Sequence, residues 1–302
     1  MSKKLLFIVN PLSGKGTSKN SFLGIVDTFT QNDLEVTIRT TQSKNDAFEY
    51  VRDNAANYDL LVVSGGDGTL NKAIRGLMKI EKNKRPELGY IPAGTTNDFA
   101  SHMKISKNMK RAALDIVKGY PFKCDIGLFN DNNFIYVAAF GAFTDVAYDT
   151  PQQNKNVLGH AAYVLEGAKR LSTLKPVSMK VICDDGEFEG EYIYGMVSNT
   201  NYLGGVKAEK VFKAQLNDGL FEVILVKNPK IMLETQDLLT RLMTQDFSSD
   251  AFVVLRTDKI KFVSPNPVQW TLDGEFGGAI TEAEIINAKQ AVTFALGKEM
   301  EQ

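Results

Sequence analysis

The sequence predicts an α/β amino-terminal domain with a parallel sheet, followed by a second, β-rich domain with antiparallel strands. Short apolar runs alternate with helical patterns in the first part of the chain, which is typical of repeated βαβ units. From about Asp125 the pattern changes to strands in which polar and apolar residues alternate, as in antiparallel sheets with one buried face. We therefore place the domain boundary at 128/129 in this chain of 302 residues.

Four strands are expected in the first domain, at residues 5–9, 34–39, 60–64 and 88–92. The helix after the first strand has an amphipathic stripe at i, i+3, i+4 and i+7, made of Phe22, Ile25, Val26 and Phe29. A second helix is expected to begin with Asp46 as its N-cap. Ligands of parallel α/β sheets bind at the carboxyl ends of the strands, so the loops that follow these strands are the candidate binding loops.

Five strands are expected in the second domain, at residues 134–139, 177–184, 191–198, 220–227 and 253–263. In the second of these, Val177, Met179 and Val181 alternate with mostly polar residues, which predicts one buried face. Two helices are expected to interrupt the strands, at about 161–171 and 232–243.

The segment 65–69, Gly-Gly-Asp-Gly-Thr, follows the third strand and predicts a phosphate-binding turn. Glycine lets the backbone approach a ligand closely, and the first amides of the next helix favour an anion. Asp67, placed among those amides, is a candidate ligand for a magnesium ion or its waters. The alternative is a tight turn in which the aspartate only caps the helix.

Three other turns carry polar groups that suit the same chemistry. Residues 10–16, Asn-Pro-Leu-Ser-Gly-Lys-Gly, are not a Walker A loop, since Val9 stands where its first glycine is required. In residues 92–99, Gly94 would let the backbone approach a ligand closely, and Thr95 and Asp98 would offer polar groups at the start of a helix. The alternative is that these residues form only an ordinary N-cap. Residues 272–275, Leu-Asp-Gly-Glu, place two carboxylates at a turn. Without the other motifs, this segment would indicate only a β-hairpin.

Composition excludes several classes of protein. A net charge of −1 gives no general attraction to nucleic acid, so we expect no nucleic-acid partner. Two distant cysteines, Cys124 and Cys183, provide neither a disulfide framework nor a zinc site, which suits a reducing cytoplasm. No run approaches the roughly 18 apolar residues of a spanning helix, so we expect no transmembrane segment. The lysine-rich segments 104–111 and 207–213 could form local basic faces, although most such clusters are solvated surface.

Taken together, these strings resemble the catalytic family of the diacylglycerol kinases, in particular the small bacterial lipid kinases. The order and spacing of the motifs match over nearly the whole chain: NPLSG at 10–14, GGDGTLN at 65–71, GTTNDFA at 94–100, CDIG at 124–127, LNDGLFEV at 216–223 and LDGE at 272–275. The glycine turn by itself is shared with NAD kinases. The conjunction of motifs is what makes the lipid-kinase interpretation specific.

The resemblance implies a two-domain enzyme with ATP and Mg²⁺ between the domains, residues 289–302 returning to the first domain, and a lipid hydroxyl as acceptor. It also implies a cytoplasmic protein that reaches its lipid peripherally at the inner membrane surface. Transfer to an alcohol benefits from a carboxylate that takes the proton, and Glu275 matches the family's proposed general base. By the same comparison Asp67 belongs at the ATP phosphates and the catalytic magnesium, with Asp98 and Asp125 as outer members of the acidic cluster.

Motif by motif, the resemblance also implies two sets of ligands. The nucleotide set is Asn10, Pro11, Leu12, Ser13, Gly14, Thr41, Gly66, Asp67, Gly68, Thr69, Leu70, Asn71 and Thr95. A separate structural magnesium would be held by the Asp218 side chain and the carbonyls of Gln215 and Leu220, although a plain β-turn would use the same residues.

Some positions depart from the family pattern, and some alternatives remain. Lys72 stands where relatives commonly carry an acidic residue and Ser101 where a basic one is frequent, so the local charge near the phosphates differs. The apolar stretch 138–143 is a candidate lining for an acyl chain, although aromatic residues at strand spacing are more often core. An NAD kinase-like phosphotransferase is the second hypothesis, and a non-catalytic nucleotide or lipid sensor the third. We expect diacylglycerol as the acceptor and phosphatidic acid as the product, although neither the identity of the acceptor lipid nor a homodimer follows from these residues.

Overall fold

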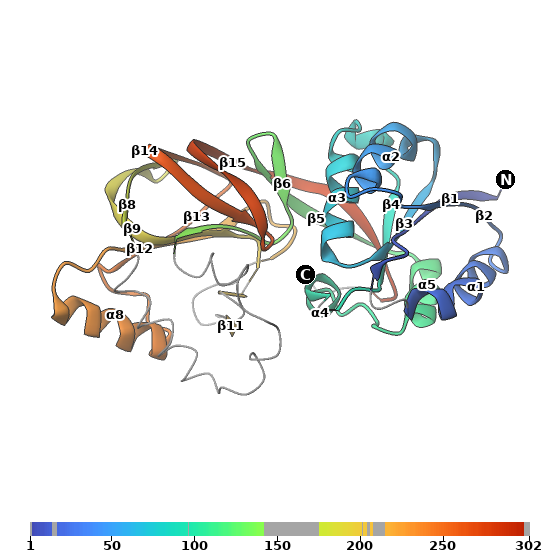
Figure 1. Cartoon of the computed structure of the whole chain (residues 1–302), viewed down its shortest axis with the longest axis horizontal. Helices are drawn as coiled ribbons and strands as arrows, with labels where there is room; N and C mark the ends of the chain where they lie inside the picture. Colours follow the sequence, from blue (N-terminus) through green and yellow to red (C-terminus); the bar gives the residue numbers. More distant parts are fainter. Residues whose placement is uncertain are drawn as a thin grey trace. The chain divides into compact units, whose positions relative to one another are not determined.

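The computed structural model describes residues 2–13, 17–95, 97–141, 175–200, 202–203, 206–207 and 215–298 (Figure 1). The chain divides into two compact units. Unit 1 comprises Met1–Cys124 and Gln290–Gln302, and unit 2 comprises Asp125–Lys289. The domain boundaries expected from the sequence, 128/129 and 288/289, lie beside these limits.

Unit 1 contains a parallel sheet whose strands run in the order β2-β1-β3-β4. The strands are β1 (Lys3–Val9), β2 (Leu34–Thr40), β3 (Leu60–Gly65) and β4 (Glu87–Pro92). All residues of β3 are buried, as expected for a strand that is covered on both faces of its sheet.

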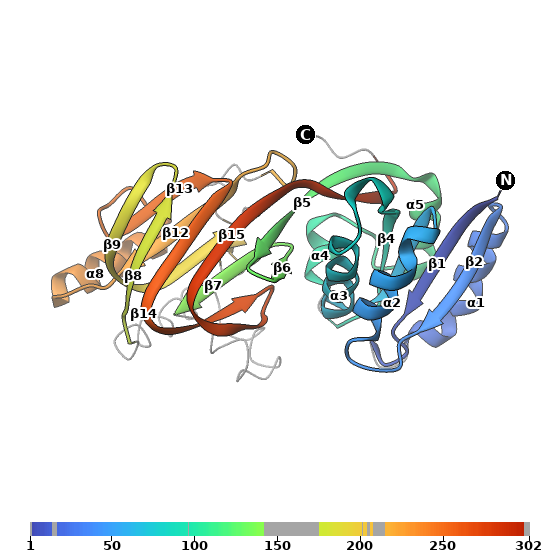
Figure 2. The same cartoon turned by 90° about the horizontal axis from the view of Figure 1, so that it is seen from above.

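Helices cover both faces of this sheet (Figures 1 and 2). One face packs against α1 (Thr17–Thr30) and α5 (Met109–Lys118), where Phe29 and Ile116 join Phe7 in one buried cluster. The other face is covered by α2 (Asp46–Asn54) and α3 (Asp67–Met78). Full burial of a side chain such as Phe29 stabilises the fold by about 1.5–3 kcal/mol. The α/β architecture with a parallel sheet is confirmed.

The beginning of α2 differs from the sequence-based expectation. Asp46 is the first helical residue and Asn45 occupies the N-cap position, so the predicted cap is wrong by one residue. The buried carboxylate of Asp46 accepts hydrogen bonds from Arg39 Nη2 (3.0 Å) and Gln42 N (2.6 Å). Burial acts to raise the pKa of Asp46, but these two hydrogen bonds outweigh it and hold the pKa below its usual range. Asp46 therefore joins β2 to α2 instead of capping the helix.

Unit 2 is built mainly from antiparallel strands. They are β6 (Asn132–Phe134), β7 (Val137–Gly141), β8 (Val177–Cys183), β9 (Gly186–Ser198), β10 (Tyr202–Leu203), β11 (Val206–Lys207), β12 (Phe221–Lys227), β13 (Phe252–Thr257) and β14 (Lys259–Leu272). Among the described residues of unit 2 the helix is α8 (Met232–Thr244), close to the expected 232–243. The β-rich second domain is confirmed.

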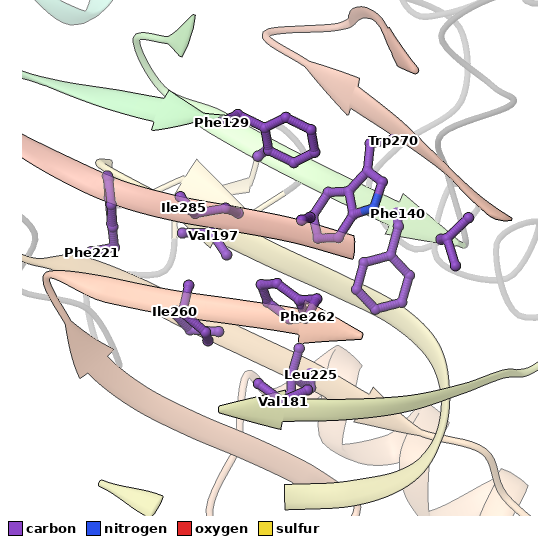
Figure 3. Close-up of a cluster of buried hydrophobic side chains, with 14 of the residues drawn as sticks. Phe129, Phe140, Val181, Val197, Phe221, Leu225, Ile260, Phe262, Trp270 and Ile285 are labelled. Carbon is purple, nitrogen blue, oxygen red and sulfur yellow. The ribbon is translucent and has the colours of Figure 1, made fainter. Parts of the chain in front are cut away.

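Aromatic side chains fill the core of unit 2 (Figure 3). The Trp270 ring lies between Phe129, Phe140 and Phe262, with ring centroids 5.1, 4.9 and 5.1 Å away, respectively. Tilted and edge-to-face pairs at these distances add to the energy of burial. Phe140, a candidate for lining an acyl chain, is fully buried in this core. Phe143 lies outside the described residues, as does the expected helix at 161–171.

Two of the expected strands have different limits in the structure. The expected strand 253–263 is two strands, β13 and β14, which are separated at Asp258. The expected strand 134–139 covers the end of β6 and the beginning of β7.

Two long strands, β5 (Tyr120–Phe129) and β15 (Glu275–Leu296), belong to both units. β15 pairs with β14 from Glu275 to Ile286, and Phe294 then pairs with Leu88 of β4. Arg85 Nη1 also donates to Ala291 O (2.7 Å). The end of the chain is therefore part of the unit 1 sheet. In the described part of the chain, no helix is long and apolar enough to cross a membrane.

Candidate phosphate-binding site

Two glycine turns of unit 1 touch each other at the carboxyl ends of neighbouring strands. The β3–α3 turn comprises residues 65–69, and the β4–α4 turn comprises residues 92–98, where α4 (Asp98–His102) begins. A Cβ atom added to Gly94 would lie only 2.6 Å from Gly66 Cα. Ala93 N donates to Gly65 O (2.8 Å). Glycine is required at residue 94 because the two turns are in backbone contact.

Asn97 and Tyr90 hold the β4–α4 turn in place. Asn97 is buried and has a left-handed backbone (φ 53°). Its Oδ1 accepts from Gly94 N (2.9 Å) and its Nδ2 donates to Gly94 O (2.8 Å). The Tyr90 hydroxyl donates to Gly65 O (3.1 Å) and so connects β4 with the β3–α3 turn. Burial, together with the charge of Asp67, raises the pKa of Tyr90, which keeps this hydroxyl protonated.

Asp67 connects the two turns. It is the first residue of α3, and its Oδ1 accepts a hydrogen bond from Phe99 N (3.3 Å) in α4. Thr69 N and Leu70 N donate to Gly66 O, which closes the first turn of α3. The first amides of a helix this long have no intrahelical acceptors and favour an anion. A carboxylate beside them is suited to hold a cation against that anion.

The loop after β1 meets the β3–α3 turn through Asn10. Asn10 N donates to Ser64 O (2.9 Å), and Asn10 Nδ2 donates to Thr69 Oγ1 (3.0 Å). Asn10 Oδ1 accepts from Leu12 N (3.0 Å), which folds the loop back on itself. Thr41 N donates to Val9 O (2.9 Å), so the end of β2 also lies at this edge.

The structure therefore gathers most of the predicted nucleotide residues at one edge of the unit 1 sheet. Leu12 is 90% exposed and Thr95 is also exposed, whereas Leu70 is fully buried in the core. Gly14 lies outside the described residues, and the side chain of Asp98 is not described. The unusual Lys72 reaches toward Gly68 O (Nζ to O 3.4 Å), which places a positive charge beside this edge. Ser101 Oγ donates to Asn97 O (3.2 Å) within α4.

The turn that was expected to hold a structural magnesium lies in unit 2, before β12. Asp218 Oδ1 accepts from Leu220 N (2.9 Å), and Oδ2 accepts from Arg256 Nη2 (2.6 Å). Each carboxylate oxygen has a further lone pair, so these bonds leave acceptor capacity for a cation. A metal ion here would have the Arg256 guanidinium as a neighbour. In the described part of the chain, no group of three or more His, Cys, Asp or Glu side chains is arranged to hold a metal.

Asp125 lies beside this same turn. Its carboxylate is fully buried, and Oδ2 accepts from Gly219 N (2.6 Å). Its backbone N donates to Leu216 O (2.7 Å). Asp125 therefore orders the backbone of the Asp218 turn. Its expected membership of an acidic cluster with Asp67 stays a prediction.

The two carboxylates of the β14–β15 hairpin have different surroundings. Asp273 accepts hydrogen bonds from Ile135 N (2.8 Å), Tyr136 N (2.8 Å) and Val137 N (3.1 Å). Glu275, two residues later, is exposed, as is the neighbouring Phe276. Asp273 thus holds the hairpin, whereas Glu275 is accessible from solvent.

Sequence reasoning did not assign roles to Asn97, Tyr90 or Asp273. For Asn97 a signal was present, because asparagine after a glycine turn is among the residues that adopt a left-handed backbone most readily. For Tyr90 and Asp273 no local pattern gives the partner, since Tyr90 bonds a carbonyl of the preceding strand and Asp273 bonds amides more than 130 residues away.

Comparisons with known proteins agree with this arrangement. The family model described as the diacylglycerol kinase catalytic domain matches residues 4–129, and one described as the YegS C-terminal NAD kinase beta sandwich-like domain matches residues 139–292. A diacylglycerol kinase of Bacillus subtilis (strain 168) is 31% identical over 98% of this chain and 97% of its own. A diacylglycerol kinase of Staphylococcus aureus (strain Newman) is 33% identical over 97% of this chain and 92% of its own.

A solved structure is also similar to this chain over nearly its whole length. A Bacillus anthracis str. Sterne protein, crystallised as a candidate diacylglycerol kinase, has a TM-score of 0.78 and 26% identity over 97% of this chain and 95% of its own. With the glycine turns joined in unit 1 and a β-rich unit 2, the chain belongs to the diacylglycerol kinase family and is a phosphotransferase that acts on an alcohol.

Proposed function

We propose that this enzyme transfers the γ-phosphoryl group of ATP to the free hydroxyl of diacylglycerol and forms phosphatidic acid. The observation that carries the proposal is the contact between the two glycine turns, with Asp67 bonded across them. This arrangement offers helix amides to phosphate oxygens and a carboxylate to a metal. The two relatives named above are diacylglycerol kinases, and this chain matches each of them over nearly its whole length.

In this proposal, unit 1 holds the triphosphate. The amides of the β3–α3 turn and the loop after β1 bind phosphate oxygens, and Thr69 and Asn10 support each other through their hydrogen bond. Phosphoryl transfer depends mainly on positioning and on neutralising charge. Mg²⁺, when bound, supplies part of that neutralisation, and Asp67 is the residue proposed to hold it. The chemistry of the donors fits, because hard cations prefer carboxylate oxygen.

Glu275 is the proposed general base. The acceptor hydroxyl forms a bond to the γ-phosphorus while the bond from that phosphorus to the β,γ-bridging oxygen breaks and ADP leaves. The hydroxyl proton passes to a carboxylate that must be accessible to substrate. The exposed Glu275 meets this requirement, whereas the neighbouring Asp273 is occupied by three backbone amides.

The second metal set is proposed as structural. Asp218, with the carbonyls of Gln215 and Leu220, would hold Mg²⁺ beside Arg256, and the buried Asp125 would keep this turn in shape through Gly219 N. Asp98 and Asp125 as ligands of the catalytic metal are part of the same proposal. The enzyme is further proposed to be cytoplasmic and to reach its lipid at the inner membrane surface, because diacylglycerol resides in the bilayer.

An acceptor panel tests the activity. Purified enzyme with Mg²⁺ and γ-labelled ATP is offered diacylglycerol, phosphatidylglycerol, a sphingoid base, undecaprenol and NAD, each in its own reaction. We expect labelled phosphatidic acid from diacylglycerol as the main product. Labelled NADP in place of a labelled lipid would support the NAD kinase alternative, and no transfer to any acceptor would support a non-catalytic role.

A further inference from the structure

A concave site lies in unit 1, and Tyr90 is the residue that it shares with the phosphate-binding site. A cavity of about 140 Å³ lies between β4, the α4–α5 connection, α5 and the end of β15. Its polar lining consists of Tyr90, Lys104, Arg111, Asp115 and Lys298. At about 30 Å³ per water molecule in the liquid, this volume suits a ligand the size of a few waters. We call it the Lys104 cavity.

The charges around the Lys104 cavity favour an anion. Among the described lining residues, Lys104, Arg111 and Lys298 are cations and Asp115 is the carboxylate. Asp115 Oδ1 has two ion-pair partners, Arg111 Nε at 3.1 Å and Lys118 Nζ at 3.9 Å. Neither Lys104 nor Lys298 has an ion-pair partner among the described residues. Within the described part of the chain, two positive charges at the cavity therefore have no matching negative charge.

The side chain of Asp115 limits which kind of anion would fit the cavity. Its Oδ1 is buried and accepts no hydrogen bond of acceptable geometry, although Arg111 Nε is close. Gly297 closes over this side chain, because a Cβ at residue 297 would collide with Asp115 Cγ. A buried acceptor without a donor is unfavourable. An anion that still carries a proton would supply the donor, whereas a fully ionised anion would supply none and would be repelled by the Asp115 carboxylate.

Lys104 has a backbone conformation that its residue type disfavours. It follows α4 with φ 54°, at the end of a turn closed by Ile105 N donating to Ala100 O (2.8 Å). Glycine is the usual residue at this position of a helix end, since a left-handed backbone strains residues that have a Cβ. Strained residues of this kind are concentrated at binding sites. Lys104 has this conformation and is one of the residues that line the cavity.

We propose that the Lys104 cavity binds a protonated phosphate group. Lys104, Lys298 and Arg111 would donate to its oxygens, and Asp115 Oδ1 would accept from its P–O–H. At neutral pH, hydrogen phosphate has both the negative charge that the cations favour and the proton that Asp115 Oδ1 can accept. Sulfate has only the negative charge. Tyr90 lines the cavity and also donates to Gly65 O, so the bound group would contact a residue that supports the β3–α3 turn. This inference goes beyond the kinase activity and does not depend on it.

Inorganic phosphate tests the site directly. The full chain is titrated with phosphate and, separately, with sulfate at equal ionic strength, by isothermal titration calorimetry. We expect phosphate to bind more tightly than sulfate. In Lys104→Gly the affinity for phosphate should fall roughly fivefold, the effect of losing one exposed ionic contact, and in Lys104→Gly with Lys298→Ala it should fall further. Asp115→Asn should reduce the preference for phosphate over sulfate.

Two features keep this test independent of folding. Lys104→Gly relieves the backbone strain, so its melting temperature should equal or exceed that of the wild type. Lys107→Ala is the matched control, because Lys107 is an exposed lysine of the same connection that does not line the cavity. Binding of phosphate that is equal in all variants, or no binding to the wild type, would overturn the proposal.

Two sources of the phosphate group are distinguished with vesicles. Phosphatidylcholine vesicles with and without phosphatidic acid are sedimented with each protein. Binding that needs phosphatidic acid and is lost in Lys104→Gly but kept in Lys107→Ala would assign the site to a lipid headgroup. Vesicle binding unaffected by Lys104→Gly, together with the calorimetric result above, would assign it to free phosphate.

Discussion

The contact between the glycine turns can be tested by adding a single methyl group. In Gly94→Ala the new Cβ would lie 2.6 Å from Gly66 Cα and 2.8 Å from Asn97 Oδ1. The first neighbour is backbone and the second is held by hydrogen bonds to Gly94, so neither can move cheaply. Overpacking of this kind costs about 1–3 kcal/mol. The turns should also separate, which should raise the KM for ATP.

Gly66→Ala is the matched control, because its Cβ would meet only Gly94 Cα, at 3.4 Å. We expect this variant to lose less than about 1 kcal/mol, since a few tenths of an ångström of adjustment relieve the contact. The free energy of unfolding is measured by urea titration followed by far-ultraviolet circular dichroism. Equal stability of the two variants would refute the argument that the turns are in backbone contact.

Three further predictions concern carboxylates. Asp273→Asn should lower the melting temperature more than Glu275→Gln does, because weaker acceptors would face three backbone amides at residue 273; equal effects would refute the separation of their roles. Asp46 has a lowered pKa, so its contribution to stability is present above its unfolded pKa and is lost as the pH falls through the folded one. Asp46→Asn should therefore flatten the acid limb of a plot of stability against pH, and an unchanged limb would contradict this. Glu222 is the opposite case: burial raises its pKa to about 7 despite Arg256, so stability should decrease as the pH rises from about 4.5 to about 7, and Glu222→Gln should remove this decrease in urea midpoints.

The sequence was sufficient for the α/β unit because its strands are short apolar runs bounded by glycine, proline or polar turns. It was also sufficient to place Asn10, Gly66 and Gly94 at one edge, since the carboxyl ends of parallel strands meet there. What it did not contain was the contact itself, which depends on the distance between two turns more than 25 residues apart.

The remaining differences have physical reasons. Aspartate is favourable both at the N-cap and in the first turn of a helix, so the pattern around Asp46 did not distinguish the two positions. The strands on either side of Asp258 are both apolar and merged into one run in the sequence. The long β15 strand was not predicted, because its glycine and alanine residues break the alternation that marks a half-buried strand.

The two carboxylates of the β14–β15 hairpin show how far the site can be predicted from the sequence. Asp273 and Glu275 are equivalent in the sequence pattern, and only the position of the amides of 135–137 shows that the first is structural. In the same way, the hydrogen bond from Gly219 N to the Asp125 carboxylate in unit 2 was not foreseen, and the expected grouping of Asp125 with Asp67 stays a prediction. Long-range partners of this kind leave no local signal.

In the proposed mechanism the glycine turns position ATP and Glu275 takes the proton from the lipid hydroxyl. Transfer of labelled γ-phosphoryl to diacylglycerol in wild type and Glu275→Gln, with ATP binding measured separately, tests it most directly. We expect unchanged ATP affinity in Glu275→Gln with kcat lower by roughly 10²- to 10⁴-fold, the usual contribution of a general base. Turnover equal to that of the wild type would contradict it.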